Sequence, residues 1–418
     1  WVAVVSAVVL PVSWRVVSAE ALPEATGAQP VSKPRVRAKE SVQFKNFIIN
    51  PAQQIACAWV FVLLLFVVTS WAGMCFYMDN YNKYKEKILN ADKLSQEKKD
   101  YYLKVAERVN NNGFPIILNS YHLSNLVGIK WDILKKLIND NVSSYHKFYI
   151  TKKDRISKRE ILAPSQELSY VQKYICTEIL NKVRISDACY GFVSGKNIID
   201  NAKKHLNSEM ILNIDLKDFF PSISSDRVYY IFNKLCGYDK TLSFCLTKLV
   251  TYRNMVPQGA CTSPIISNIV LYMLDIRLLK LAEKNNINYT RYADDITFSG
   301  TKNQINHRFY SLVRKIVEDE GFKINDKKVH FSSESQRQEV TGLIINNGNV
   351  RIKRNYIRKI EQELYYIGKF GLENHIKNMG TYNAFYVEHL KGKIMFVREV
   401  NIDKGNKLLE KFNSLNLQ

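Results

Sequence analysis

The sequence predicts an α+β protein that ends in an all-helical region, and three patterns carry this prediction. Residues 211–216 alternate between apolar and polar side chains, as in a strand. Over residues 265–281 apolar side chains recur every three or four positions, as on one face of a helix. From residue 351 onward the sequence is helical in pattern and basic. Helices that alternate with antiparallel strands indicate an α+β domain, to which the last region adds an all-α appendage.

The other elements follow from the same periodicities and from turn residues. In chain order we expect a helix over 80–110, two short helices over 118–140 with a turn at Gly128, a basic strand pair over 149–164, an amphipathic helix over 165–183, a helix over 304–320 that ends at Gly321, strands over 322–325 and 328–332, and a hairpin that turns at Asn346-Asn347-Gly348. The sequence contains no internal repeat.

The chain is strongly basic. Its 418 residues include 60 Lys and Arg against 39 Asp and Glu, a formal charge of +21, of which residues 78–418 carry +18. A globular region this basic usually binds a polyanion, and nucleic acid is the leading candidate, against the alternative of a merely solvated basic surface. The seven cysteines are widely spaced without a Cys-x-x-Cys pair. This spacing argues against a disulfide framework or structural zinc and favours a reducing cytoplasm.

The first 77 residues differ in composition from the rest. Residues 56–77 carry no charge and are long enough to span a bilayer. The basic residues between 33 and 45 would keep the preceding side in the cytoplasm, where a nucleotide-using domain must also lie, and a single span cannot satisfy both. Met78 opens a stretch that reads as a complete cytosolic protein. Two alternatives therefore stay open, a membrane element and upstream translated sequence that belongs to no fold.

Adjacent carboxylates in Tyr292-Ala293-Asp294-Asp295 are the most informative local feature. They lie between two short apolar runs, at a predicted turn between strands, where like charges repel and need a nearby cation. A third carboxylate, Asp215, ends the predicted strand over 211–216. Carboxylates at the ends of neighbouring strands suit Mg²⁺, which phosphoryl-transfer enzymes use to bind the attacking and leaving oxygens. Each aspartate taken alone could equally be an ordinary turn residue.

Together with the loop Pro257–Pro264, these acidic motifs make residues 115–350 resemble the fingers and palm of a reverse transcriptase. Two further motifs, Asn201-Ala202-Lys203-Lys204-His205 and Val340-Thr341-Gly342, make the resemblance closest to bacterial retron reverse transcriptases. The resemblance implies a right-hand polymerase fold, in which the fingers and palm contain an antiparallel sheet and the thumb is helical. It also implies an RNA-directed DNA polymerase, that is, a nucleotidyltransferase.

The resemblance assigns roles to single positions. Asp215, Asp294 and Asp295 would be the catalytic residues and would bind two Mg²⁺ ions. The residues that would bind the incoming nucleotide are Lys158, Arg159, Asp218, Phe220, Gln258 and Gly259. Among them, Arg159 would grip the triphosphate and Phe220 would exclude a ribose 2′-OH. Lys152 or Lys153 would assist, and Lys327 or Lys328 would lie near the pyrophosphate. Several of these roles have a structural alternative. Phe220 could be an aromatic residue of the core, the loop 257–264 could simply lead into the next helix, and Lys327 or Lys328 could be an ordinary surface lysine.

A second set of positions would recognise RNA. By resemblance it consists of Asn201, His205, Val340, Thr341, Gly342, Arg354 and Arg358. The two arginines lie in the basic C-terminal region beside Tyr356, Tyr365 and Tyr366, a combination that suits an RNA stem with stacked loop bases. Gly392, in a segment that resembles the family's thumb, would allow close helix packing. The alternatives are a buried polar network for Asn201, His205 and Thr341, and a solvated basic surface for the C-terminal helices.

The implied domain order is an N-terminal extension outside the family plan over 1–77 with a candidate transmembrane segment at 56–77, a helical region over 78–145, fingers and palm over 146–350, and a helical, RNA-binding thumb over 351–418. The enzyme would use dNTPs to copy part of a cognate structured non-coding RNA, which serves as template and primer. The product would be single-stranded DNA joined to that RNA (msDNA).

The resemblance further implies a role in anti-phage defence together with an effector protein. A cytoplasmic location is expected, with membrane association if 56–77 is a genuine span. One alternative is a group II intron-like or other bacterial reverse transcriptase. The other is a membrane-anchored effector that uses the polymerase fold as an RNA scaffold.

Overall fold

The structure, a computed structural model, describes residues 81–151, 158–379 and 385–415. The chain divides into two units, Trp1–Val67 and Val68–Gln418, and every described residue belongs to the second. The described part contains no helix that is both long and apolar enough to cross a bilayer. The candidate span at 56–77 lies outside the described residues, as do Lys152 and Lys153.

Helices open the described part of the chain. The predicted helix over 80–110 is two helices, residues 81–89 and α3 (Gln96–Asn111). The pair predicted over 118–140 is confirmed as α4 (Ser120–Val127) and α5 (Trp131–Asn139). The Asn119 side chain caps the start of α4, and Gly128 ends it with a φ of 79°, a left-handed conformation that glycine adopts without a steric penalty.

The basic strand pair is the antiparallel hairpin of β1 (Tyr145–Thr151) and β2 (Lys158–Pro164). The predicted helix over 165–183 begins as α6 (Gln166–Tyr174) and continues through a π-helical turn and a short 3-10 turn. The next helices are α7 (Ile198–Lys203), α8 (Ser225–Tyr230) and α9 (Lys240–Val250). The helix predicted over 265–281 is broken at Leu271 into α10 (Ser263–Val270) and α11 (Tyr272–Lys284).

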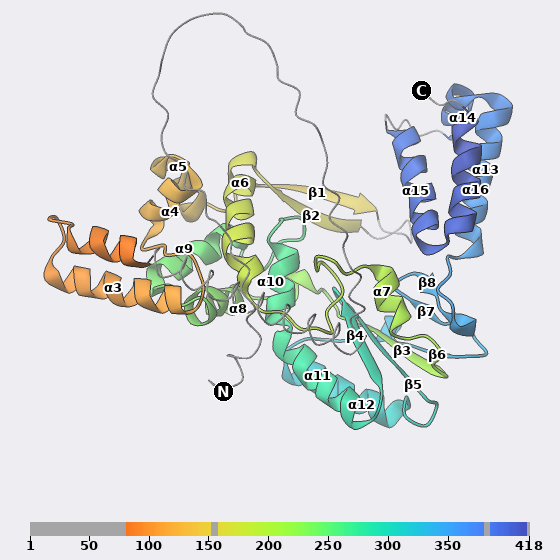
Figure 1. Cartoon of the computed structure of the whole chain (residues 1–418), viewed down its shortest axis with the longest axis horizontal. Helices are drawn as coiled ribbons and strands as arrows, with labels where there is room; N and C mark the ends of the chain where they lie inside the picture. The colour runs from red at the N-terminus through yellow and green to blue at the C-terminus, as the bar shows by residue number, and fades with distance from the viewer. Residues whose placement is uncertain (1–80, 152–157, 380–384, 416–418) are drawn as a thin grey trace, which may run out of the picture. The chain divides into compact units, whose positions relative to one another are not determined.

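The largest sheet of the described part is four-stranded and antiparallel, with the order β4-β5-β3-β6 (Figure 1). Its strands are β3 (Met210–Asp215), β4 (Asn288–Tyr292), β5 (Asp295–Gly300) and β6 (His330–Ser333). Leu212 and Phe298 pack on one face into the main hydrophobic core, which includes residues of α11 and of α12 (His307–Asp319). Ile211 packs into a second core with residues of α7 and of the hairpin β7 (Glu339–Val340) and β8 (Leu343–Ile344).

Two local predictions fail in detail. No strand forms over 322–325, because Ile324 makes only a single bridge, with Leu216. The β7–β8 hairpin turns at Thr341-Gly342 rather than at 346–348, and both of its turn residues have positive φ, 46° and 87°. Positive φ at both central positions gives a turn whose twist matches that of the flanking strands. At 346–348 the chain reverses as a 3-10 turn, which is closed by one bridge between Ile344 and Arg351.

The C-terminal region is helical, as predicted. It comprises α13 (Arg354–Phe370), α14 (Leu372–Met379), α15 (Tyr386–Val400) and α16 (Ile402–Asn413). These helices surround a core of their own, to which α13, α15 and α16 contribute residues such as Leu364, Ile394 and Leu408. The prediction that Gly392 allows close helix packing is wrong, because a Cβ there would meet no atom within 4 Å. Gly405 has this role instead, since a Cβ on it would overlap the backbone of Arg398.

Candidate active site

The register of the sheet brings the three predicted aspartates to one end of it. Asp215 is the last residue of β3, and its cross-strand partner is Asp295, the first residue of β5. Tyr292 pairs with Asp295 across the β4–β5 hairpin, so Ala293 and Asp294 form a two-residue turn. Leu216, next to Asp215, donates its backbone N–H to the carbonyl of Asp294 at 3.1 Å. Residues that are some 80 positions apart in the sequence thus meet at the turn.

The electrostatics of the site reflect this crowding of acids. Asp215 is only 6% exposed; its Oδ1 accepts from Lys328 Nζ at 2.6 Å and its Oδ2 from Asn325 Nδ2 at 3.1 Å. Burial raises the pKa of Asp294, and the charge of Asp215 raises it further. Burial disfavours the charge on Lys328, but the hydrogen bond to Asp215 and the charges of the three aspartates outweigh it and raise the pKa of Lys328.

A cavity of about 680 Å³ extends from these acids to the β1–β2 hairpin. It is lined by most of the residues predicted to bind nucleotide, together with two of the acids: Lys158, Arg159, Asp215, Asp218, Phe220, Gln258 and Asp294. Gly259 lies beside this cavity, where a Cβ would be 2.8 Å from the carbonyl oxygen of Leu162. Leu162 in turn donates its N–H to the Gln258 carbonyl at 2.8 Å, so the predicted nucleotide loop is fastened to β2.

Two observations separate Asp295 from the other acids. Its side chain is exposed, and it does not line the 680 Å³ cavity. A larger cavity of about 830 Å³, lined by apolar side chains such as Phe114 and Met273, contains none of the predicted site residues. The cavity beside Asp215 is therefore the one in which acidic, basic and aromatic groups of the predicted site come together.

The donor chemistry of the site fits a divalent cation. Asp215 and Asp294 offer hard carboxylate oxygens, the ligands that Mg²⁺ prefers, and their mutual repulsion is what a cation would relieve. The predicted trio, however, is not assembled as a ligand set. Across residues 81–151, 158–379 and 385–415, no three His, Cys, Asp or Glu side chains are grouped so that they could hold a metal ion. Asp215 is instead paired with the ammonium of Lys328.

Sequence reasoning left Lys327 and Lys328 as alternatives and missed two other residues. Lys328 lines the cavity and contacts Asp215, so the structure favours it over Lys327. Asn325, which was assigned to a strand, contacts the other oxygen of Asp215. Arg291 is fully buried beside the acidic turn, and a charged residue inside an apolar run was the sequence signal for it.

The residues predicted to recognise RNA fall into two groups. Asn201, His205 and Val340 are no more than 1% exposed, so direct contact of their side chains with RNA is contradicted in this structure. The alternative of a buried polar network describes two of them. His205 Nδ1 bonds Ser299 Oγ at 2.8 Å and its Nε2 bonds Thr290 Oγ1 at 2.7 Å, which joins the turn after α7 to β4 and β5.

Asn201 Nδ2 donates to Thr341 Oγ1 at 3.5 Å, so α7 is also linked to the β7–β8 turn. Thr341 is half-buried and Gly342 is exposed at that turn. Arg354 and Arg358 are exposed and lie four residues apart on α13, on one side of the helix. These four residues, unlike the buried group, have surface that a ligand can reach.

The burial of His205 makes stability depend on pH. Burial lowers the pKa of His205 to about 3, against about 6.5 in an unfolded chain. Between these pH values the unfolded state therefore binds more protons than the folded state. The folded state keeps its full stability, as far as His205 is concerned, above about pH 6.5 and loses it progressively as the pH falls toward 3. From pH 7 to pH 5 we expect His205 to remove about 2 kcal/mol from the free energy of unfolding.

Urea denaturation at both pH values measures this loss. His205→Gln should flatten the pH dependence, whereas His146→Gln, at an exposed position of β1, should leave it as in the wild type. Equal slopes for His205→Gln and the wild type would contradict the assignment.

Comparison with known proteins supplies the family context. The family model described as "Reverse transcriptase (RNA-dependent DNA polymerase)" matches residues 150–345. Retron Ec86 reverse transcriptase from Escherichia coli is 32% identical over 311 residues, which cover 74% of this chain and 92% of that protein. Retron Mx162 reverse transcriptase from Myxococcus xanthus is 30% identical over 346 residues, 74% of this chain and 69% of that protein.

Among solved structures, telomerase from Candida albicans in complex with a fragment of telomeric RNA has a TM-score of 0.36 and 12% identity, with 68% of this chain and 67% of that chain covered. This structural similarity is weak.

Proposed function

Because this chain belongs to the bacterial retron reverse transcriptases and is an RNA-directed DNA polymerase, we propose that it copies part of one cognate structured RNA into DNA that stays joined to that RNA. The prediction of the family and of the enzyme class is confirmed. The observation that carries the finer proposal is that the chain matches 92% of the length of a retron enzyme. The convergence of acids, basic groups and Phe220 on one cavity supports it.

In this proposal Asp215 and Asp294, with Asp295 beside them, would hold two Mg²⁺ ions. The ions would lower the pKa of an attacking hydroxyl and neutralise charge on the leaving pyrophosphate. The chain's own residues supply positioning, which phosphoryl transfer needs more than covalent help. The guanidinium of Arg159 would present paired N–H donors to the triphosphate. Burial raises the pKa of Asp294, and the positive charge of Arg159 acts in the opposite direction, with a smaller effect. Lys328, which contacts Asp215, supplies a second cation to the lining of the same cavity.

Selection of deoxynucleotides is assigned to Phe220. Its ring packs on Phe219 with centroids 5.1 Å apart and lines the cavity next to Asp218. A ring braced in this way would occupy the space that a ribose 2′-OH needs. The ratio of dTTP to UTP incorporation by Phe220→Ala tests this role, and an unchanged ratio would refute it. Gln258 lines the same cavity and would contact the sugar or the base edge.

RNA binding is assigned to the basic C-terminal region. A cavity of about 440 Å³ lies where the β8–α13 connection meets α15 and α16. Its cationic lining consists of Arg337, Arg351, Lys353, Arg354 and Lys404. Exposed aromatic rings on α13 include Tyr365, which is 59% exposed and lies 5.8 Å from Lys369 Nζ. Cationic groups for phosphates and open rings for bases together suit structured RNA with unpaired loops.

The remaining parts of the proposal concern the cell. The compartment is proposed to be the cytoplasm, where dNTPs and RNA are available, and the five described cysteines are free thiols. The RNA–DNA product and the enzyme would act with an effector protein in anti-phage defence. The division into an N-terminal extension (1–77), a helical region (78–145), fingers and palm (146–350) and thumb (351–418) is retained as part of the proposal.

Isolation of the nucleic acid bound to the enzyme tests the proposal. The full chain is expressed together with its flanking DNA, purified, and the bound nucleic acid is sequenced with and without RNase. We expect an RNA–DNA hybrid in which RNase shortens the molecule and leaves one DNA of defined length. The Asp294→Asn/Asp295→Asn chain, expressed in parallel, should carry the RNA alone. DNA without attached RNA, or copies of an intron-like RNA, would overturn the proposal in favour of another type of reverse transcriptase.

A further inference from the structure

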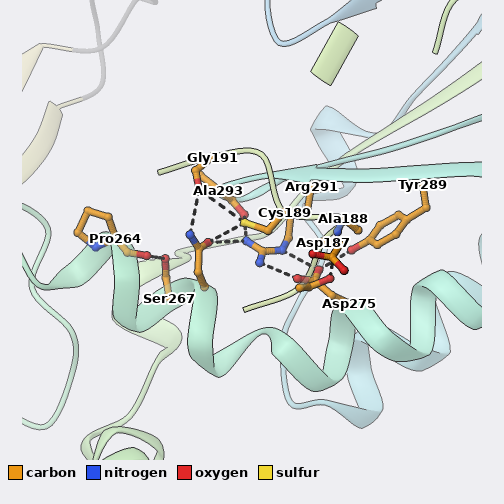
Figure 2. A network of polar contacts seen from close by, with 12 residues as sticks. Asp187, Ala188, Cys189, Gly191, Pro264, Ser267, Asp275, Tyr289, Arg291 and Ala293 are labelled. Atoms are coloured by element: carbon orange, nitrogen blue, oxygen red, sulfur yellow. Dashed lines mark hydrogen bonds and ion pairs between the residues drawn. The ribbon is translucent and has the colours of Figure 1, made fainter. Parts of the chain in front are cut away.

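A buried ion pair lies directly behind the acidic turn (Figure 2). Arg291 on β4 and Asp275 on α11 are both 0% exposed. Nε and Nη2 of Arg291 each donate to one Asp275 oxygen at 2.7 Å, and Tyr289 donates its hydroxyl to Asp275 Oδ1 at 2.6 Å. The carboxylate therefore neutralises the guanidinium through two of its three nitrogens, and the third nitrogen is left for another partner.

That third nitrogen is directed at the turn itself. Arg291 Nη1 donates to the carbonyl of Ala293 at 3.0 Å and to Asn268 Oδ1 at 3.1 Å. The carbonyl of Ala293 belongs to the peptide bond that joins Ala293 to Asp294. At the other end of Asp294, its own carbonyl accepts from the backbone N–H of Leu216, next to Asp215. Both peptide groups that flank Asp294 are thus held by hydrogen bonds.

The turn is also held from outside. Ala293 has a φ of 56°, a left-handed conformation that is unfavourable for a residue with a Cβ and persists where the surroundings enforce it. Gly191 packs against it so closely that a Cβ on Gly191 would lie 2.5 Å from the Ala293 nitrogen. Asn268 links Arg291 to Gly191, since its Oδ1 accepts from Arg291 Nη1 at 3.1 Å and its Nδ2 donates to the Gly191 carbonyl at 2.9 Å.

We propose that Arg291 is a positioning residue that fixes the peptide before Asp294 and so aims this carboxylate at Asp215, with Gly191 as the outer wall of the same turn. The inference rests on the proposed catalytic role of Asp294. A purely structural ion pair would need only the two bonds to Asp275. The third bond adds a requirement on geometry, and a small displacement of a reacting group lowers the rate more than it lowers stability.

Arg291→Lys separates charge from geometry. Lysine keeps a cation for Asp275, but a single ammonium cannot reproduce the planar set of donors that serves Asp275 and Ala293 together. The assay is extension of oligo(dT) on poly(rA) with dTTP and Mg²⁺, with the active fraction taken from the burst amplitude and folding from thermal unfolding. We expect kcat per active enzyme to fall about 10- to 100-fold, with KM for dTTP changed by less than about threefold.

Two further variants keep the proposal testable. Arg277→Lys is the matched control, because Arg277 lies on the same helix as Asp275 but pairs with Asp319 and Glu320 at a partly exposed site. The kcat of this variant should stay within about twofold of the wild type. Gly191→Ala pushes the turn from the outside and leaves the Arg291–Asp275 pair intact. It should lower kcat about 10-fold or more with little change in KM.

The outcomes are distinct. A folded Arg291→Lys with kcat like that of Arg277→Lys would overturn the proposal. If Arg291→Lys does not fold, Gly191→Ala decides, and wild-type kcat in that variant would overturn it. Loss of kcat in both, with KM preserved, supports it. A failure of the proposed role of Asp294 appears separately, as wild-type kcat in Asp294→Asn on the same template.

Discussion

Exchange of Asp294 and Asp295 for asparagine is expected to reduce dTTP incorporation about 10⁴-fold, because removal of one electrostatic group at a reacting centre already costs about 10²-fold or more. Asparagine keeps the size of each side chain but removes its charge and replaces one acceptor oxygen with an NH2 group, which only donates. The loss should therefore fall on kcat, while the complex with template and primer still forms. Primer extension on poly(rA) with oligo(dT), together with filter binding of the same duplex, measures both quantities.

Asp319→Asn provides the control for this double variant. Asp319 is 44% exposed at the end of α12 and pairs with Arg277, away from the cavity that holds Asp215. Its substitution should leave incorporation near the wild-type level. Synthesis by Asp294→Asn/Asp295→Asn at more than about a tenth of the wild-type rate would refute the site, because removal of the charged groups of an active centre lowers the rate much further than that.

Asp275→Ala is expected to lower the free energy of unfolding by about 3–5 kcal/mol, the loss seen when one partner of a buried ion pair is removed. The substitution leaves the guanidinium of Arg291 buried without a counter-charge and deprives the Tyr289 hydroxyl of its acceptor. Desolvation of an unpaired charge dominates this loss, so it should exceed the effect of the missing contact alone. Urea denaturation followed by circular dichroism measures the change.

Two comparisons show whether the unpaired charge is the cause. In Asp275→Leu/Arg291→Met both charges are gone, and most of the lost stability should return. In Glu334→Ala an exposed pair with Lys302 is broken, which should cost no more than about 1 kcal/mol. A double variant as unstable as Asp275→Ala would show that shape, rather than charge, stabilises this part of the palm.

The positions of the acids could be predicted from the sequence because they depend on local structure. Asp215 ends a strand whose alternation is visible in the sequence, and Asp294 lies in a tight turn between two apolar runs. Strand ends and turns are set by residues within a few positions, so the place of each acid followed from its neighbours. Their meeting at one edge is a prediction from these strand ends, which the resemblance supports, and the β3–β5 register accounts for it.

Other features depend on contacts between distant segments and could not be predicted in this way. His205 was assigned to RNA, yet it bonds Thr290 and Ser299 in the interior. Gly405, rather than Gly392, lies where two helices approach each other closely. In each case the residue type allows more than one role. A histidine can bind a ligand at the surface or join buried hydrogen-bonding groups, and a glycine in a helix can allow a close contact with another helix or have no packing role. The tertiary neighbours decide between these roles, and periodicity does not report them.

The separate core of the C-terminal helices has a consequence for how such enzymes diverge. Leu364, Ile394 and Leu408 stabilise this bundle without residues from the main core, which packs against the four-stranded sheet. If Arg354 and Arg358 bind RNA as proposed, such exposed positions on α13 can therefore change to suit a new transcript with little effect on the folding of the sheet that carries Asp215. Lineages that descend from one ancestral polymerase could in this way exchange their templates while DNA synthesis stays the same.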